Sequence, residues 1–413
     1  MTGHRMAAVD AQFLWTSAKI PSDEFLLYAF AGEPADLARA VEQVCDRARV
    51  CPDLSTRVEE GCALTYPRWV PTVVGPEWVR RHTLSDGNWS DCLAVVAGMA
   101  ADQVDVRATP WRLHVFAPVF GIPGVSGPGA VAVLQIAHAL ADGARASAMA
   151  AWLFGRDARV PEIDWQRGGF LPWRAMQAAR AHRDLVRDTE AGLVTPGPQP
   201  RPPQATNNRP EGARAARTLV RKRAQLSGAT ITVRVLAAVS EALSGLLGAP
   251  IESLGAEVPM AKAGVPHAYN HFGNVVVGLY PQLAYEERMR RIADELANAR
   301  RRLEHPANHS GSRAFAAVPA VLLRWGVSQF DAEARPAQVA GNTVVSSVHR
   351  GAADLSFGNC PVVLTAGYPA LSPCMSLTHG VHGIGDTIAI SVHAAESAVP
   401  DVDGYLQLLD AAL

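Results

Sequence analysis

The sequence is poor in cysteine, in net charge and in long apolar runs. Its 413 residues include six cysteines and no Cys-x-x-Cys pair, so we expect reduced thiols and no disulfide framework. Lysine and arginine number 38 against 39 aspartates and glutamates, a net charge of −1, which gives no global field that would attract nucleic acid. No run approaches the roughly 20 apolar residues of a membrane span, and the first residues lack the apolar core of a signal peptide. We therefore expect a cytoplasmic protein that does not bind nucleic acid.

Pairs of residues with the spacing of metal ligands are also few. The pairs His267/His271 and His305/His309 have the i, i+4 spacing of helical metal ligands. A proline interrupts or borders each pair, and no third ligand accompanies either one. We predict no metal site.

The length and the 48% hydrophobic content suit two domains, or one two-lobed unit with a large core. Between residues 196 and 214 six prolines are interspersed among Gln, Asn and Arg, so we predict neither helix nor strand there. We interpret this stretch as a crossover linker. It divides the chain into an N-terminal half, residues 1–195, and a C-terminal half, residues 215–413.

Apolar periodicity predicts strands and helices that alternate irregularly in both halves. The predicted strands cover residues 25–30, 112–116, 130–136, 274–281, 343–348, 362–366 and 387–392. The predicted helices cover residues 34–49, 143–154, 231–247, 286–303 and 401–413. We expect strands 112–116 and 130–136 to pair as a hairpin. The pattern favours an α/β fold with mixed sheets.

One short stretch suggests chemistry. His138 comes just after the apolar, β-branched segment 130–136. Asp142-Gly143 comes four residues later, at the start of an Ala-rich helix. Such a turn can project an imidazole into a cavity while the aspartate bonds the local backbone. The alternative is a buried histidine with a purely structural role.

His-x-x-x-Asp-Gly after a strand resembles the active-site signature of the acyltransferases related to chloramphenicol acetyltransferase. Further stretches, in order, resemble the bacterial wax ester synthase/diacylglycerol acyltransferase family. They are Asp-Ala-x-Phe-Leu at residues 10–14, Pro-Trp-x-Leu-His at 110–114, Gly-Asn at 273–274, Ser-Ser-Val at 346–348 and Val-Pro-Asp at 399–401. Together these matches cover nearly the whole chain.

The resemblance implies a two-lobed chloramphenicol acetyltransferase-like fold, in which the second lobe completes a central substrate tunnel around His138. Acyl-CoA as co-substrate and an alcohol acceptor would enter from opposite sides, and the acyl group would pass directly between them. No other cofactor is implied. The acceptor would be a fatty alcohol, a diacylglycerol or a specialised metabolite, giving wax ester, triacylglycerol or another ester.

The chain departs from the family pattern at several positions. Ala137 stands where the family has a first histidine, and Thr232 and Val233 stand where it has an Asn-Asp pair. Ser347 replaces the asparagine of its Ser-Asn-Val segment. We interpret the chain as a divergent member with an altered acceptor, and loss of activity is the alternative.

Each candidate residue has an expected part. His138 would act as general base, since an alcohol needs its proton removed as it attacks a thioester. Asp142 either orients the imidazole, as in a triad, or turns away into a structural ion pair, which we favour. Gly143 leaves backbone room, and an N–H near it, or the hydroxyl of Ser346 or Ser347, would stabilise the oxyanion. The remaining candidates lining the site are Ala137 and Asn274.

Other functions stay open at this point. A catalytically inactive acyl-CoA- or lipid-binding relative would keep the fold, and an amine acceptor or a carrier-protein donor would keep the chemistry. The basic stretches 214–223 and 288–302 either contact CoA phosphates or form solvated faces. A lipid acceptor would imply peripheral contact with a membrane or lipid droplet.

Overall fold

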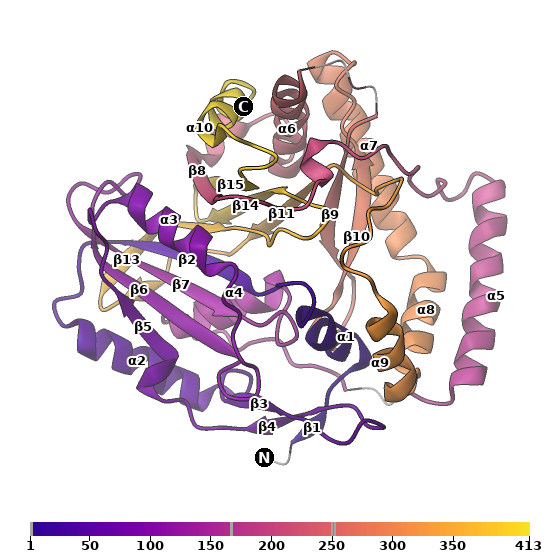
Figure 1. Cartoon of the computed structure of the whole chain (residues 1–413), viewed down its shortest axis with the longest axis horizontal. Helices are drawn as coiled ribbons and strands as arrows, with labels where there is room; N and C mark the ends of the chain where they lie inside the picture. Colours follow the sequence, from indigo (N-terminus) through magenta and orange to yellow (C-terminus); the bar gives the residue numbers. More distant parts are fainter. Residues whose placement is uncertain (1–2, 166–167, 249–250, 252) are drawn as a thin grey trace.

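The computed structural model describes residues 3–165, 168–248, 251 and 253–413. Its described part is built on two six-stranded sheets, which lie next to each other in Figure 1. Across the first sheet the strands are β12 (Ser356–Phe357), β13 (Cys360–Gly367), β2 (Glu24–Ala31), β7 (Gly129–Ile136), β6 (Trp111–Val119) and β5 (Val79–His82). Across the second they are β10 (Phe272–Gly278), β9 (Gly255–Ala261), β11 (Thr343–His349), β14 (Leu377–Ile384), β15 (Thr387–Ala395) and β8 (Arg214–Lys222). A small third sheet contains β1 (His4–Arg5), β4 (Arg68–Pro71) and β3 (Thr56–Glu59).

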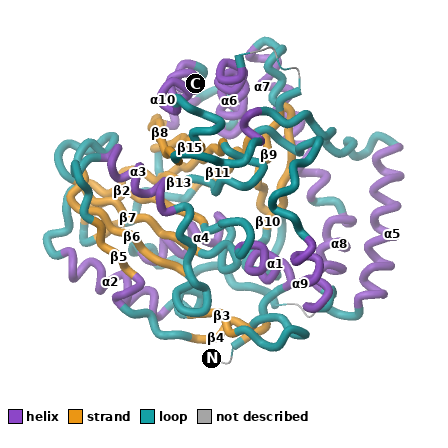
Figure 2. The backbone as a smooth tube through the Cα atoms, in the orientation of Figure 1, coloured by secondary structure: helices purple, strands orange, loops and turns teal. Residues whose placement is uncertain are grey.

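Most helices lie on the outer faces of these sheets or along one flank of the molecule, whereas α3 (Trp89–Met99) packs between the sheets (Figure 2). In chain order they are α1 (Ala8–Ser17), α2 (Leu37–Val50), α3 (Trp89–Met99), α4 (Gly143–Leu153), α5 (Leu171–Glu190), α6 (Ile231–Leu247), α7 (Tyr285–Leu303), α8 (Pro306–Ala316), α9 (Ala320–Gln329) and α10 (Val402–Ala411). Strand pairs are antiparallel except for β5–β6, β11–β9 and β11–β14, which are parallel. The predicted α/β class with mixed sheets is confirmed.

Alternation along β2 shows how the layers form. Tyr28 and Phe30 pack into the cluster that holds α2 and α4, whereas Leu27 and Ala29 face the other way. Successive side chains of a strand point to opposite faces, so one apolar strand serves two cores. The inner cluster also contains Ala389 of the second sheet, which joins the two lobes.

The two halves of the sequence are interlocked. Strand β13 comes from the C-terminal half but pairs with β2, with Thr365 opposite Tyr28. The first sheet therefore contains strands from both sides of the crossover. The crossover itself contains a 3-10 turn, Ala205–Asn207, and β8 begins at its last residue, so the prediction of no helix or strand there is wrong at these places. Asn207 donates to the carbonyls of Gly341 and Cys374, which fixes the segment to the second lobe.

The predicted elements all occur, with shifted ends. The predicted hairpin is confirmed, because β6 and β7 pair antiparallel. Helix α2 begins at Leu37 with Asp36 as its cap, so its predicted start at residue 34 lies outside it. Among the described elements, helices α1, α3, α5, α8 and α9 and strands β1, β3, β4, β5, β8, β9, β12 and β14 were not predicted. Strand β14 contains Gly380, where a Cβ would lie 2.2 Å from the Gly367 carbonyl oxygen of the facing sheet, so only glycine fits this close approach.

Candidate active site

His138 lies directly after β7, a central strand that is buried at all eight positions. The chain turns there, since Ala137 N–H donates to the Pro110 carbonyl (2.9 Å) and Leu140 N–H to the Ala137 carbonyl (2.8 Å). The His138 side chain keeps 17% exposure, while Ala137 beside it is buried. A rigid central strand thus places this imidazole at the boundary of a cavity.

Two aromatic rings hold the imidazole. Phe13 of α1 stacks on His138 with ring centroids 4.0 Å apart and an interplanar angle of 8°. The ring centroid of Phe272, at the start of β10, lies 5.7 Å from that of His138, and the two ring planes make an angle of 27°. Burial lowers the pKa of His138 below its ordinary value, so the imidazole is neutral near pH 7 and can accept a proton.

Glu24, the first residue of β2, is a site residue that sequence reasoning missed. Its Oε1 lies 3.7 Å from Nε2 of His138. Burial, and then the charge of Asp142, raise the pKa of Glu24 to about 8, while the Arg350 guanidinium opposes this. The carboxyl is therefore protonated at neutral pH. What brings Glu24 to the imidazole is its position opposite Ile136, the residue that ends the strand leading to His138.

Asp142 turns away from the imidazole. One of its carboxylate oxygens accepts from the Arg145 N–H (2.9 Å) as the cap of α4, and the other accepts from the His271 N–H (2.8 Å). The ion pair that we favoured for Asp142 is not formed. Arg145 pairs instead with Asp53, at 2.8 Å. Asp142 thus fixes the start of α4 against the loop before β10, which makes it a positioning residue.

Asp10 supports the same loop from the other side. This fully buried carboxylate of α1 accepts from the Tyr269 N–H (3.1 Å), the Asn270 N–H (3.0 Å) and the Asn270 side-chain amide (2.9 Å). Asn270 also donates to the His138 carbonyl (2.8 Å). Burial raises the pKa of Asp10 to about 7 even though these hydrogen bonds act in the opposite direction. The opening sequence motif therefore fixes the backbone at His138.

Gly143 lies where the two lobes meet. A Cβ on Gly143 would be 3.7 Å from Val348 Cγ2 of β11 and 3.8 Å from a Glu24 carboxylate oxygen. These are ordinary contact distances, so the protein alone does not require glycine here. Glycine instead leaves space free between β11 and the His138 turn.

The two candidate serines lie on opposite faces of β11. Ser346 shares its face with Val348, which approaches Gly143. Ser347 points the other way, and its hydroxyl bonds to that of Thr232 at 2.9 Å. Ser347 and Thr232, both departures from the family pattern, therefore meet in space.

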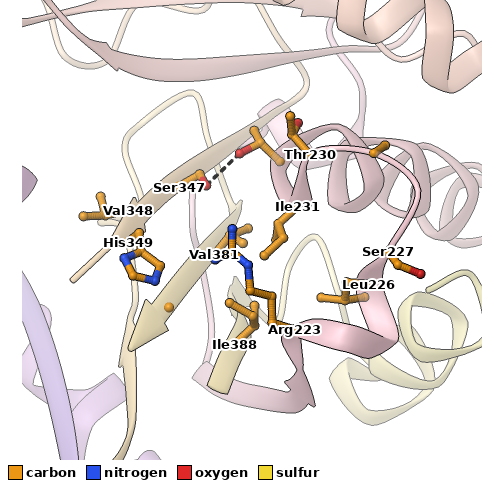
Figure 3. Close-up of a pocket in the computed structure, with 13 residues that line it drawn as sticks. Arg223, Leu226, Ser227, Thr230, Ile231, Ser347, Val348, His349, Val381 and Ile388 are labelled. Atoms are coloured by element: carbon orange, nitrogen blue, oxygen red, sulfur yellow. Dashed lines mark hydrogen bonds between the residues drawn. The ribbon is translucent and has the colours of Figure 1, made fainter. Parts of the chain in front are cut away.

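Ser347 lines a cavity of about 610 Å³ at the start of α6 (Figure 3). Arg223 and His349 supply its basic side chains, and Val348 places it next to the lobe junction. The Thr230 hydroxyl caps the helix by accepting from the Val233 N–H (3.3 Å). The helix start and the arginine give this cavity positive character.

A second cavity, of about 380 Å³, contains His138 itself. Its charged lining side chains are three acids and one base, Asp23, Glu60, Asp105 and Arg107. Asp23 is held by the Val104 N–H (2.7 Å) and by Gln135 (2.8 Å), and burial raises its pKa to about 6. The two cavities therefore differ in charge. His138 lines the second, and Gly143 approaches Val348, which lines the first.

Asn274 lies in β10 with its side chain exposed, whereas the nearby Asn270 and Phe272 are the residues that contact His138. The other histidine patterns have structural roles. His382 is buried within β14, and His305 caps α8 through the Ala307 N–H. Within the described ranges, no group of three or more His, Cys, Asp or Glu side chains is arranged to hold a metal ion.

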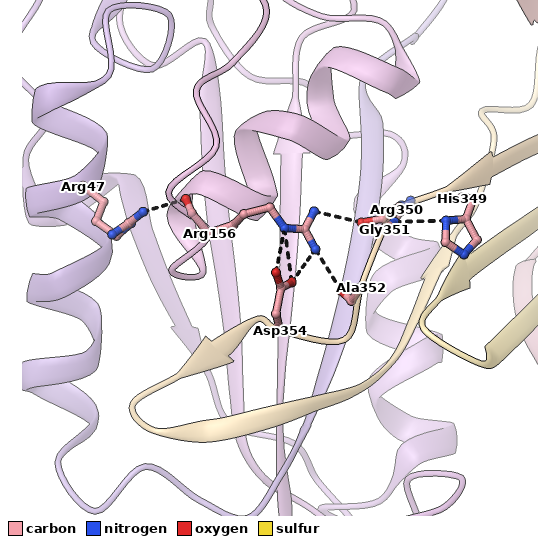
Figure 4. Close-up of polar contacts among 7 residues, drawn as sticks. All are labelled: Arg47, Arg156, His349, Arg350, Gly351, Ala352 and Asp354. Atoms are coloured by element: carbon pink, nitrogen blue, oxygen red, sulfur yellow. Dashed lines mark hydrogen bonds and ion pairs between the residues drawn. The ribbon is translucent and has the colours of Figure 1, made fainter.

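The loop after β11 is tied to the first lobe by Arg156 (Figure 4). Its guanidinium donates to the carbonyls of Arg350 (3.0 Å) and Ala352 (2.8 Å) and pairs with Asp354. Arg350 itself is buried, with its guanidinium carbon 5.1 Å from the centre of the Tyr28 ring. Arg156 thus sets the position of the cation that faces Glu24.

The two lobes and mixed sheets, with the histidine turn at their junction, are those of the chloramphenicol acetyltransferase-like fold. Residues 269–413 match the family model of the WS/DGAT C-terminal domain, which confirms the predicted resemblance to the wax ester synthase/diacylglycerol acyltransferase family. No protein in a comparison with curated proteins matches significantly.

Solved structures show the same fold over the whole chain. The wax ester synthase/diacylglycerol acyltransferase from Marinobacter aquaeolei VT8 matches with a TM-score of 0.64 and 18% identity over 99% of this chain and 98% of that one. The first condensation domain of the CDA synthetase matches with a TM-score of 0.61 and 16% identity, over 100% and 96%. A starter condensation domain of rhizomide synthetase in complex with C8-CoA matches with a TM-score of 0.55 and 14% identity, over 99% and 94%.

Proposed function

We propose that this protein is an acyltransferase that moves an acyl group from acyl-CoA to the hydroxyl of an alcohol acceptor, with His138 as general base. The observation that carries the proposal is the neutral imidazole of His138, which stacks on Phe13 and lines a cavity beside the lobe junction. A base of this kind typically contributes about 10²- to 10⁴-fold to the rate.

In the proposed reaction the acceptor oxygen attacks the thioester carbonyl carbon while the imidazole takes the hydroxyl proton. The carbon–sulfur bond then breaks, and the imidazolium returns the proton to the CoA sulfur. The oxyanion is stabilised by the Gly143 N–H at the start of α4 or by the hydroxyl of Ser346, which shares a face of β11 with Val348. Asp10, Asn270 and Asp142 fix the backbone around the base.

The charges of the two cavities assign the substrates. The cavity with Arg223 and His349 suits the phosphates of CoA. A condensation domain of the same fold holds C8-CoA, which supports acyl-CoA as donor. The cavity with Asp23, Glu60 and Asp105 suits a hydroxyl compound that carries further polar groups, so we place the acceptor there.

The proposal includes contact with a lipid surface. Phe170 and Trp173 at the start of α5 are 73% and 51% exposed, and Leu322 and Trp325 of α9 are 51% and 64% exposed. These aromatic and aliphatic side chains suit the interface of a bilayer. No helix among the described residues has both the length and the apolar character needed to cross a membrane.

The test is mass-spectrometric detection of product from purified protein, a long-chain acyl-CoA and a panel of acceptors. The panel contains a fatty alcohol, a diacylglycerol, small polyols and an alkylamine. We expect an ester whose formation falls at least 100-fold in His138→Ala and stays within two-fold in the matched control His267→Ala, whose side chain is exposed. An amide product, or equal rates in the two variants, would contradict the proposal.

A second candidate is an acyl-CoA-binding relative without turnover. The observation that favours it is the position of the Glu24 carboxyl, which lies beside Nε2 of His138. A general base would use one of its two ring nitrogens, and Nε2 is one of them. Such a protein would bind acyl-CoA equally with or without His138 and form no product with any acceptor.

A further inference from the structure

A cavity of about 620 Å³ lies outside the acyl-transfer site, between the small third sheet and α4. His138 is not part of its lining. The side chains that matter for its chemistry are His4, Asp53, Trp69, Arg145, Trp165 and Tyr269. The reaction proposed above uses none of them in contact with substrate.

Aromatic rings form a continuous wall in this cavity. His4 packs on Trp165 with ring centroids 4.1 Å apart, and Trp165 meets Tyr269 edge-on at 5.1 Å. Trp69 meets the other side of Tyr269 at 5.4 Å. Trp165 is 38% exposed, so part of this wall is open to a second flat ring.

Three nitrogen atoms in the same lining lack hydrogen-bond partners within the described part of the chain. They belong to His4 (Nε2), Trp69 (Nε1) and Arg145 (Nε). Arg145 and Trp69 are more than nine-tenths buried, and their unpaired nitrogens are obligate donors. A buried donor left unpaired costs about 1–3 kcal/mol, and all three atoms belong to residues that line this one cavity.

The charges in the cavity cancel. Arg145 pairs with Asp53 at 2.8 Å and donates to the Pro161 carbonyl at 2.8 Å. Arg159 and Glu162, both exposed, supply one charge of each sign. The lining therefore does not require a ligand of high charge.

We propose that this cavity binds a flat aromatic molecule that carries a carboxylate or carbonyl oxygen. The ring stacks on the wall of Trp165, His4 and Tyr269, and the oxygen accepts from the unpaired donors. The cavity is separate from the acyl-transfer site but adjoins its backbone. Tyr269 donates its N–H to Asp10, and its carbonyl accepts from the Asp142 N–H (3.4 Å).

The test is isothermal titration of the full chain with three probes of the same ring size, namely 2-naphthoate, 2-naphthamide and naphthalene. We expect one saturable site for 2-naphthoate or 2-naphthamide, at least ten-fold tighter than for naphthalene. Trp165→Ala should weaken binding at least ten-fold. The matched control Trp173→Ala removes a more exposed indole from α5 and should change the affinity less than two-fold.

Saturating acyl-CoA should leave the affinity unchanged, and His138→Ala should do the same. The assay measures binding alone, so its outcome does not depend on whether acyl transfer occurs. Absence of saturable binding, equal affinity for naphthalene, equal effects of the two tryptophan variants, or displacement by acyl-CoA would each overturn the proposal.

Discussion

Two carboxyl groups flank the His138 turn, Asp10 fully buried and Glu24 partly buried, and they differ in how the protein uses them. Asp10 accepts three hydrogen bonds from Tyr269 and Asn270. Glu24 has the His138 imidazole at 3.7 Å, and no hydrogen bond to its side chain is found in the described chain. Burial raises the pKa of both groups, to about 7 and about 8.

The difference separates an acid that holds the backbone through hydrogen bonds from one that accepts none within the described chain. Each hydrogen bond that Asp10 accepts satisfies a buried donor, so its removal leaves several groups unpaired. Glu24 accepts no such hydrogen bonds within the described chain, so its protonation can change with pH and with what binds beside His138. The same residue type thus supports the backbone on one side of the base and controls charge on the other.

The largest effect that would test this contrast is on stability. Asp10→Ala should lower the free energy of unfolding by about 3 kcal/mol, because three N–H bonds lose their acceptor. Urea denaturation at pH 7.5 measures it. The control is Asp36→Ala, which removes the cap of α2 and should cost about 1 kcal/mol. Equal costs would remove the distinction drawn for Asp10.

Glu24→Gln should stabilise the protein increasingly as pH rises. The wild-type carboxyl has a pKa of about 8 when folded, so the folded state holds a proton that the unfolded state releases near pH 4.5. Wild-type stability is therefore lost between these pH values, and the glutamine variant should gain about 3 kcal/mol on it between pH 5 and pH 8. Denaturation midpoints across this range give the difference. A gain independent of pH would show that Glu24 is ionised throughout.

The pH profile of activity gives a companion measurement. Because the pKa of His138 is lowered, kcat/KM should fall only as pH drops below 6.5, when the base becomes protonated. This acidic limb should survive in Glu24→Gln, while any limb near pH 8 should disappear.

Gly143→Ala should reduce activity about ten-fold with little change in stability. Its methyl group would fill space beside Glu24 and Val348 that the protein itself leaves free. The control is Gly98→Ala in α3, where a Cβ meets nothing within 4 Å. That variant should gain about 0.5–1 kcal/mol and keep full activity. Equal activity of Gly143→Ala and Gly98→Ala would mean that no substrate passes Gly143.

The smallest effect concerns the cation that faces Glu24. Arg156→Lys would lose the forked contacts that hold the loop of Arg350, at a cost of about 1 kcal/mol. Arg39→Lys, in an exposed pair with Glu42, should leave the unfolding midpoint almost unchanged. Thermal unfolding of both variants measures the difference, and the reverse order would show that Arg156 does not hold the loop.

Much of the fold follows from local sequence. Strand β7 and helix α6 were predicted almost to their ends, because β-branched runs and helical spacing act locally. Strand β14 was missed because its glycines and histidines are not typical of a buried strand. Its Gly380 is required by the close approach of the facing sheet. The pairing of β13 with the first sheet depends on contacts over a long sequence separation, which periodicity does not report.

The site was predictable only where a motif marks it. The motif identified His138 and Asp142, and the expectation that Asp142 turns away agrees with the geometry. Glu24 and Asn270 carry no motif of their own and reach the imidazole through tertiary packing. Asn274 was taken from the family pattern, but its neighbours in sequence make the contacts.

The strand exchange between halves has a consequence for synthesis. The Thr365 hydroxyl bonds to the Leu27 carbonyl, which precedes it by 338 positions. At about 5–20 residues per second, the edge of β2 waits on the order of 20–70 s for its partner to leave the ribosome. An exposed strand edge is a template for aggregation. A nascent first lobe therefore needs protection during translation, and yield should depend on chaperones or on slow, low-temperature expression.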